Sequence, residues 1–198
     1  MHASAFPELR TARLLLRGFK AEDEAAFQGF ATAEDFWRFL PGPALTPELV
    51  TRFIAARLAE AENPSGRDWV FAVEETSMRR AIGMVRLSIA SPEHRQGNIG
   101  FSLDGAIRGR GYASEAMRAL LDYGFQVLEL HRITALADVE NARSHAVLEK
   151  LGFRREGRLM QNFFVRGQWR DCDLFALLRA EWPQRAAAPG AGGGTALA

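Results

Sequence analysis

Residues 98–128 constrain the fold most strongly, because they pass from a strand through a glycine-rich loop into a helix. Along residues 98–103 the apolar Ile99, Phe101 and Leu103 alternate with small or polar residues, as in a strand with two different faces. Beyond the loop, helical spacing relates Met117, Leu120, Leu121, Gly124 and Leu128. A helix that follows a strand so closely packs on the sheet, so this segment predicts a layered α/β domain.

The remaining patterns predict further strands and helices. Strands are expected over residues 13–17, 69–73, 82–89, 132–139, 153–165 and 169–178, and helices over residues 22–31, 47–62 and 144–151. Thr46 is a cap residue followed by Pro47 at the first helical position, which fixes the start of the second helix. The order of elements predicts a mixed α/β sheet covered by helices and closed by a hairpin over Arg166-Gly167.

Length and charge limit the class of protein. The 198 residues suffice for one domain, expected over residues 6–182, followed by a Pro/Gly/Ala-rich tail over residues 183–198 that we expect to be disordered. With 25 basic and 24 acidic residues the net charge is +1, which gives no reason to expect a nucleic-acid or membrane partner. No apolar run approaches the ~20 residues of a membrane span, and no signal peptide opens the chain, so we expect a cytoplasmic protein.

Cys172 is the single cysteine of the chain. It cannot form an intrachain disulfide or supply a zinc site, and no metal is predicted. Because no base and orienting group are recognisable near it, we interpret Cys172 as a buried small apolar residue rather than a nucleophile.

The loop before the long helix has the properties of an anion site. Gly109 and Gly111 allow the backbone to approach a ligand closely, and the following helix points its unpaired N–H groups back at the loop. Phosphate or pyrophosphate is the natural occupant, with Arg108 and Arg110 adding charge-assisted contacts. The loop lacks the lysine of a Walker sequence, and Ser114 replaces the last glycine of a dinucleotide fingerprint, so ATP and NAD are poorly supported. An empty glycine-rich turn remains the alternative.

A second segment, residues 141–157, reads as a short helix between Asn141, a good N-cap, and Gly152, a good helix stop. Together, the two segments resemble the GNAT acetyltransferase superfamily. Residues 108–113 resemble its Arg/Gln-x-x-Gly-x-Gly/Ala signature, and residues 141–153 its Asn-x-x-Ser/Ala…Lys-Leu-Gly-Phe segment. Residues 11–17 resemble the opening strand of the RimJ/RimL branch, which contains the ribosomal-protein alanine acetyltransferases.

The resemblance implies a twisted mixed sheet with splayed central strands, helices on both faces, and acetyl-CoA as acetyl donor. The splayed strands would be residues 98–103 and 132–139. The pantetheine arm would pair with Phe101, Ser102 and Leu103, while Asn141 would contact the cofactor near its thioester. The pyrophosphate would lie on the amides of Arg108, Gly109, Arg110, Gly111, Tyr112, Ala113 and Ser114.

The resemblance also implies catalytic roles. The general-acid tyrosine of many members is replaced here by Leu148, so in the RimJ/RimL manner Ser144 would stabilise the thiolate beside Asn141. The position of the RimL base is occupied by Phe163, which cannot take a proton. Other candidate bases, each more readily explained as a solvated turn or strand-end residue, are Asp138, Asp104, Glu93 and His94; His131 and His145 read as surface histidines.

The missing base bears on the acceptor. An α-amine with a pKa near ~7.8 is about a tenth deprotonated at neutral pH, and a lysine near ~10.4 only about one part in a few thousand. A protein N-terminal α-amine is therefore the first hypothesis; a polyamine, amino acid or antibiotic is the second, and a non-catalytic acetyl-CoA-binding module the third. Trp37 is the best candidate for the acceptor site, ahead of Trp69, Trp169 and residues 163–164. A homodimer through the closing hairpin is compatible with the pattern.

Overall fold

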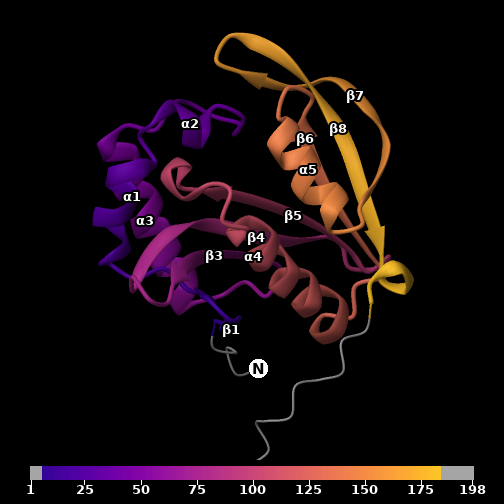
Figure 1. The fold of residues 1–198 in the computed structure, drawn as a ribbon, viewed down its shortest axis with the longest axis horizontal. Helices are drawn as coiled ribbons and strands as arrows, with labels where there is room; N and C mark the ends of the chain where they lie inside the picture. Colours follow the sequence, from indigo (N-terminus) through magenta and orange to yellow (C-terminus); the bar gives the residue numbers. More distant parts are fainter. Residues whose placement is uncertain (1–5, 184–198) are drawn as a thin grey trace, which may run out of the picture.

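The structure is a computed structural model that describes residues 6–183 (Figure 1). The tail predicted to be disordered lies outside the described residues, apart from Pro183. The strands are β1 Leu9–Arg10, β2 Leu14–Arg17, β3 Asp68–Glu75, β4 Arg80–Ser91, β5 Gln96–Leu103, β6 Arg132–Asp138, β7 Arg154–Val165 and β8 Gln168–Leu178. The helices are α1 Asp23–Phe30, α2 Glu34–Trp37, α3 Pro47–Glu62, α4 Tyr112–Asp122 and α5 Ala142–Lys150, with short turns η1 Gly105–Ile107, η2 Tyr123–Val127 and η3 Arg179–Glu181.

All eight strands belong to one sheet, in the order β1-β2-β3-β4-β5-β6-β8-β7. Each neighbouring pair is antiparallel except β5 and β6, which run parallel. The parallel pair is joined through α4, a crossover of the kind that parallel strands require. The predicted mixed α/β fold is therefore confirmed, and the predicted closing hairpin is β7–β8.

Helices cover both faces of the sheet, as the resemblance implied (Figure 1). Along β3, Val70 and Ala72 pack into the cluster under α1 and α3, whereas Phe71 and Val73 pack into the cluster under α4 and α5. The helices contribute Phe27, Phe30, Val50 and Ile54 to the first cluster and Met117, Leu120, Leu121 and Leu148 to the second. Since both faces of β3 are buried, this strand is apolar on both sides.

The sheet opens in its middle. The β5–β6 ladder pairs Gln96 with Arg132, Gly97 with Ile133 and Asn98 with Thr134. Past that point β5 stays paired with β4 and β6 with β8, but no pairing between β5 and β6 exists among residues 6–183. The two strands therefore splay, which confirms the predicted opening and leaves the edge of β5 over residues 99–103 available for other hydrogen bonds.

Capping residues mark the helix boundaries that the sequence predicts. The Thr46 side chain accepts from the Leu49 N–H, and the Asn141 side chain accepts from the Ser144 N–H. Gly152 ends α5 with φ +88°, a conformation that favours glycine. Of the helices within residues 6–183, none is long and apolar enough to cross a membrane.

Candidate active site

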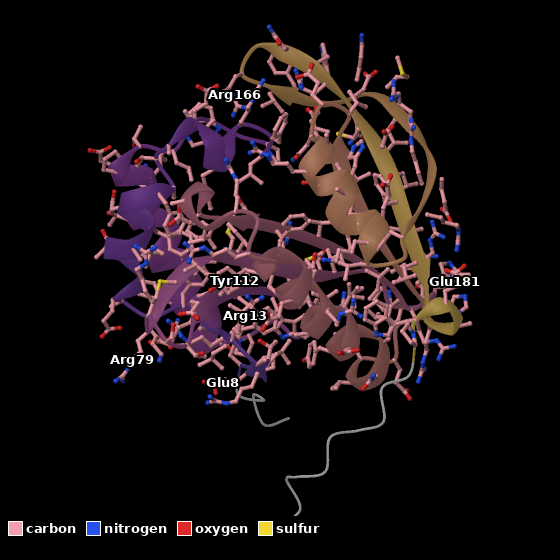
Figure 2. All side chains as sticks on the ribbon, viewed as in Figure 1. Glu8, Arg13, Arg79, Tyr112, Arg166 and Glu181 are labelled. Carbon is pink, nitrogen blue, oxygen red and sulfur yellow. The ribbon has the colours of Figure 1, made fainter. Side chains whose placement is uncertain are left out.

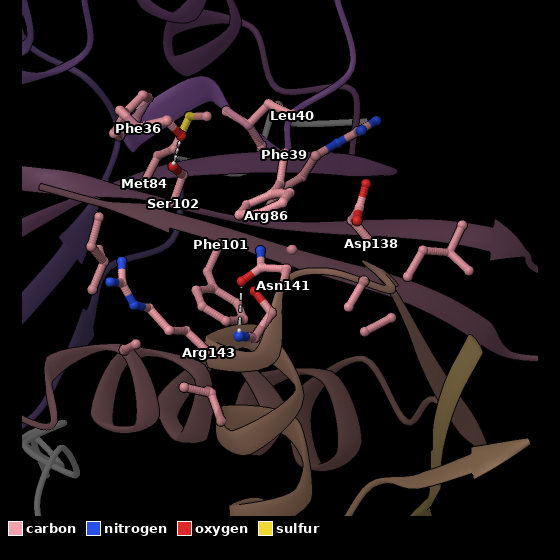
Figure 3. A pocket seen from close by; sticks show the side chains of 18 of the residues that line it. Phe36, Phe39, Leu40, Met84, Arg86, Phe101, Ser102, Asp138, Asn141 and Arg143 are labelled. Atoms are coloured by element: carbon pink, nitrogen blue, oxygen red, sulfur yellow. Dashed lines mark hydrogen bonds between the residues drawn. The ribbon is translucent and has the colours of Figure 1, made fainter. Parts of the chain in front are cut away.

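A cleft of about 1120 Å³ lies where β5 and β6 separate (Figure 3). Its walls come from both faces of the sheet: Phe36, Met84, Arg86 and Ser102 lie on the α1–α3 side of β5, and Phe101, Asn141 and Arg143 on the α4–α5 side. The cleft thus passes through the sheet. Two molecules entering from opposite faces would meet beside the unpaired edge of β5.

The α4–α5 side of the cleft ends at the glycine-rich loop. Gly109 and Gly111 have φ +77° and +80°, values that side chains rarely adopt. Gly111 is the N-cap of α4 and provides no side-chain acceptor, so the N–H groups of the first turn keep their capacity to bind an anion. The loop geometry therefore fits a pyrophosphate, and Arg108, Gly109, Gly111, Tyr112, Ala113 and Ser114 all line the cleft.

Arg13, a residue to which the sequence analysis gave no role of its own, holds this loop from outside (Figure 2). Its Nη1 donates to the Arg110 carbonyl oxygen at 3.0 Å, and its guanidinium lies 4.4 Å from the centroid of the Tyr112 ring. Glu115 in the first turn of α4 accepts from Arg13 Nε at 2.7 Å and from Thr11 Oγ1 at 2.6 Å. Arg110 does not line the cleft, so in this conformation its contribution is a carbonyl turned toward Arg13.

The predicted catalytic pair, Asn141 and Ser144, lies on the cleft wall at the start of α5. Asn141 Oδ1 accepts from the Ser144 N–H at 3.2 Å, which fixes both residues at the helix N-terminus (Figure 3). The Ser144 hydroxyl has no hydrogen-bond partner within the described part of the chain, so it is available to a ligand. Arg143, also on the cleft wall, adds positive charge beside them.

Of the candidate bases, Asp138 and Asp104 line the cleft, whereas Glu93 and His94 lie in the exposed turn between β4 and β5 and do not. Arg170 binds both oxygens of Asp138, at 2.8 and 2.9 Å. Burial raises the pKa of Asp138, but the bonds from Arg170 and from the Glu140 N–H outweigh it and hold the pKa below its ordinary value. A carboxylate held in that state is a poor proton acceptor at neutral pH.

The prediction that Cys172 is buried is correct: it lies between β6 and β7 with 2% exposure. Burial, with the nearby Asp138 carboxylate, raises the pKa of the thiol, so the nucleophilic thiolate is disfavoured. Cys172 forms part of the cleft wall together with Leu148 and Phe163, the residues at the positions of the usual general acid and base. These three side chains make that part of the wall apolar.

On the α1–α3 side, the wall is built by residues 36–41. The Ser102 hydroxyl donates to the Phe36 carbonyl at 3.1 Å and ties this segment to β5 (Figure 3). Phe36 and Phe39 line the main cleft, whereas Trp37 lines a smaller adjoining cavity and donates from its indole N–H to the Thr32 carbonyl at 3.2 Å. Trp37 thus stands behind the acceptor wall, and its predicted contact with the acceptor stays a prediction.

The other aromatic candidates for the acceptor site also differ in whether they line the cleft. Trp69 is buried in the core under α4, and Phe163 lines the cleft. Phe164 and Trp169 are more than half exposed and pack on each other at the hairpin tip, with ring centroids 5.2 Å apart. Within residues 6–183, no group of three or more histidine, cysteine or acidic side chains is placed to hold a metal ion.

Comparison with known proteins settles the family. Residues 13–154 match the acetyltransferase (GNAT) domain. The chain belongs to the GNAT acetyltransferase family. It is accordingly an acetyl-CoA-dependent N-acetyltransferase.

Individual relatives match most of the length of this chain. An uncharacterized N-acetyltransferase of Bacillus subtilis, YnaD, is 30% identical over 88% of this chain and 98% of its own length. The GNAT-family acetyltransferase structure from Bacillus anthracis has a TM-score of 0.78 at 30% identity and covers 88% of this chain and 100% of that one.

The resemblance to the RimJ/RimL branch is also confirmed. Mycobacterium smegmatis RimJ, solved with CoA-disulfide, has a TM-score of 0.77 at 29% identity and covers 92% of this chain and 91% of that one. The Escherichia coli spermidine N(1)-acetyltransferase is 32% identical over a shorter region, 54% of this chain and 58% of its own length. One of these relatives is thus named for a polyamine acceptor.

Proposed function

We propose that this GNAT enzyme acetylates the α-amine of a protein N-terminus by direct attack of the amine on the thioester of acetyl-CoA. The donor supplies an activated acetyl group. The residues of this chain align the two partners in the splayed gap, polarise the carbonyl and stabilise the departing thiolate.

The observation that carries the proposal is the state of the acids in the cleft. Those among the described residues that line it are each ion-paired with an arginine: Asp68 with Arg86, Asp104 with Arg80, and both Asp138 and Glu140 with Arg170. None of the histidines within residues 6–183 lines the cleft. A site with no ready proton acceptor suits an amine that is already partly neutral at pH 7, as an α-amine is and a lysine is not.

The cleft supports specific roles for its residues. Backbone N–H groups on the unpaired edge of β5, near Phe101, would pair with the donor and polarise its carbonyl. Asn141 would contact the donor near the thioester, and the available Ser144 hydroxyl would donate to the leaving sulfur. The amides of residues 108–114 would bind the pyrophosphate. The acceptor would enter past Phe36 and Phe39, with Trp37 supporting that wall.

A small amine is the second candidate, because one relative is named as a spermidine acetyltransferase. Polyamines are cationic, however, and the acceptor side of this cleft carries arginines rather than free carboxylates. Coverage does not separate the two candidates, since the RimJ structure covers 92% of this chain and the structure of a Vibrio cholerae spermidine N-acetyltransferase 86%. The paired carboxylates of the cleft are therefore the reason for preferring a protein N-terminus.

The proposal is tested by the release of CoA thiol from acetyl-CoA with N-terminal peptides and a panel of small amines. We expect turnover with peptides, lost with Gly111→Glu and reduced with Ser144→Ala. Blocking the peptide α-amine while leaving its lysines free should abolish turnover. Turnover only with small amines would refute the N-terminal acceptor, and acetyl-CoA binding without turnover on any amine would point to a binding module.

A further inference from the structure

The acceptor arm of the cleft, defined here as its part on the α1–α3 face of the sheet, carries an unbalanced set of charges. The ionisable side chains that line it within the described residues include Arg38, Arg57, Arg86 and Asp68, together with Asp138, which lies on the same face and is ion-paired with Arg170, so that arginines outnumber acids. Arginine stays protonated in proteins, so these guanidinium groups are permanent cations. A cationic acceptor would therefore meet like charge on its way to the thioester.

Arg86 and Asp68 form the floor of the arm. Arg86 Nε and Nη2 donate to the two Asp68 carboxylate oxygens at 2.8 and 2.7 Å across the β3–β4 pair. This bidentate contact holds the guanidinium plane in place and leaves its other N–H groups for a ligand. Asp68 therefore positions Arg86 and leaves some of the N–H donors of Arg86 unused.

Arg57 on α3 contributes a donor that lacks a partner. Its Nη1 lies 2.6 Å from Glu60 on the same helix, and Glu60 does not line the cleft. Its Nε is buried and has no hydrogen-bond partner within residues 6–183. Because that Nε is buried, a ligand in the arm would contact Arg57 through the terminal N–H groups of its guanidinium.

The space for such a ligand lies over Gly100. Arg86 is the register partner of Gly100 on β5. The Arg86 side chain therefore projects from the face of the sheet on which a side chain at position 100 would lie. A Cβ atom placed at Gly100 would find no atom within 4 Å. A group over Gly100 would lie at the splayed part of β5, where the thioester is expected, on the same face as Arg86, whose guanidinium is directed toward Asp68 on β3.

We propose that the acceptor carries a carboxylate close to its amine, and that Arg57 and Arg86 select it. Given the N-terminal acceptor proposed above, on which this inference rests, the substrate class is an N-terminus with an acidic side chain at its second residue. The carboxylate occupies the space over Gly100, and the amine points to the gap between β5 and β6.

The test uses peptides that differ only at the second residue, Ala-Glu, Ala-Gln and Ala-Lys followed by one common sequence, with free glutamate and spermidine as small amines. We expect kcat/KM for the Glu peptide to exceed that for the Gln peptide by about tenfold, and that for the Lys peptide by more. Arg57→Gln and the double variant Arg86→Gln/Asp68→Asn should bring the Glu/Gln ratio toward one. Acetyl-CoA affinity, measured by calorimetry, should not change.

Arg52→Gln is the matched control, because Arg52 is exposed on the same helix and does not line the cleft. This variant should keep the wild-type Glu/Gln ratio. A general loss of stability would lower the rates on all peptides alike and would also leave that ratio unchanged. Equal rates on all three peptides, or a ratio unchanged in both cleft variants, would overturn the inference and leave the N-terminal acceptor intact. Turnover of free glutamate but of no peptide would overturn the N-terminal acceptor and leave the selection of a carboxylate intact. Turnover of the Gln or Lys peptide but of no acidic acceptor would overturn this inference alone, and a preference for spermidine over every peptide would overturn both.

Discussion

Arg166, at the tip of the β7–β8 hairpin, lies over the ring of Trp37 in α2, with its guanidinium carbon 4.5 Å from the ring centroid (Figure 2). The same guanidinium donates to the main-chain carbonyls of Trp37 and Arg38. The contact joins the hairpin to residues 36–41, the segment that walls the acceptor arm. Since Phe163 and Val165 of the hairpin also line the cleft, Arg166 closes the acceptor arm on the side where the sheet is open.

Replacing this residue, Arg166→Ala, should loosen the acceptor wall. An exposed cation–π contact contributes about 0.5–1 kcal/mol, so we expect the acceptor KM to rise about two- to fivefold. The Kd for acetyl-CoA should stay the same, because the glycine-rich loop lies on the other face. Steady-state kinetics and calorimetry separate the two effects, with Arg158→Ala on the same hairpin as control; an equal rise in both constants would contradict this role.

Gly111→Glu should weaken acetyl-CoA binding more than about tenfold, because it forces a side chain into a left-handed conformation and brings negative charge to an anion site. Isothermal calorimetry measures the effect directly. Gly157→Glu is a suitable control, since a Cβ atom at Gly157 meets no atom within 4 Å and its φ is not in the left-handed region. Unchanged affinity in Gly111→Glu would remove the loop from the cofactor site.

Substitutions of Asn141 can separate its cap from its contact with the donor. Asn141→Ala should destabilise the fold by about 1 kcal/mol through loss of the α5 cap, whereas Asn141→Asp keeps the cap. Both should lower kcat/KM for acetyl-CoA. Thermal unfolding and steady-state kinetics together decide the matter: full activity in the Asp variant would show that Asn141 serves the helix alone.

Arg17 and Asp23 form a buried bidentate ion pair, with both side chains no more than 5% exposed and N–O distances of 2.7 and 2.8 Å. Asp23→Asn should lower the free energy of unfolding by about 3 kcal/mol, because it leaves Arg17 insufficiently compensated in the interior. Glu8→Gln, which removes the partner of the exposed Arg10, should change it by less than about 0.5 kcal/mol. Urea unfolding of the three proteins checks both values, and equal losses would argue against the buried pair as the cause.

Hydrogen bonding from Arg132 lowers the pKa of Glu156 from its ordinary 4.5 to about 2, with Arg154 adding to the effect. Because the folded-state pKa is depressed, its stabilising contribution is fully present above pH about 4.5 and is lost as the pH falls toward 2. Arg132→Gln should therefore destabilise the protein at pH 6 and have a smaller effect at pH 3. Urea midpoints at both pH values measure this, and a penalty that did not shrink in acid would contradict the assignment.

Local rules predicted most of the elements from the sequence. The Thr46 and Asn141 caps depend on side chains bonding to backbone a few residues away, and the alternation along residues 98–103 places Phe101 and Ser102 on opposite faces. The glycine-rich loop was recognisable because positive φ at Gly109 and Gly111 is a property of the residue type.

The acceptor side depended on contacts that no local pattern encodes. Arg13 meets Arg110, and Arg166 meets Trp37, across about half of the chain or more, so neither pair follows a helical or strand period. Sequence alone left Asp138 as a candidate base; its pairing with Arg170 requires β6 and β8 to be neighbours in the sheet.

Most of the elements, the glycine-rich loop and the family could thus be predicted from the sequence, because each depends on short spacings and on backbone conformations that particular residues favour. Tertiary structure alone decided which charges meet in the cleft. Arg57, Arg86 and Asp68 come from a helix and two strands, and only the packing of α3 on the sheet brings them to one arm. Electrostatics acts through space rather than along the chain, so the character of the acceptor site emerges only once the fold is formed.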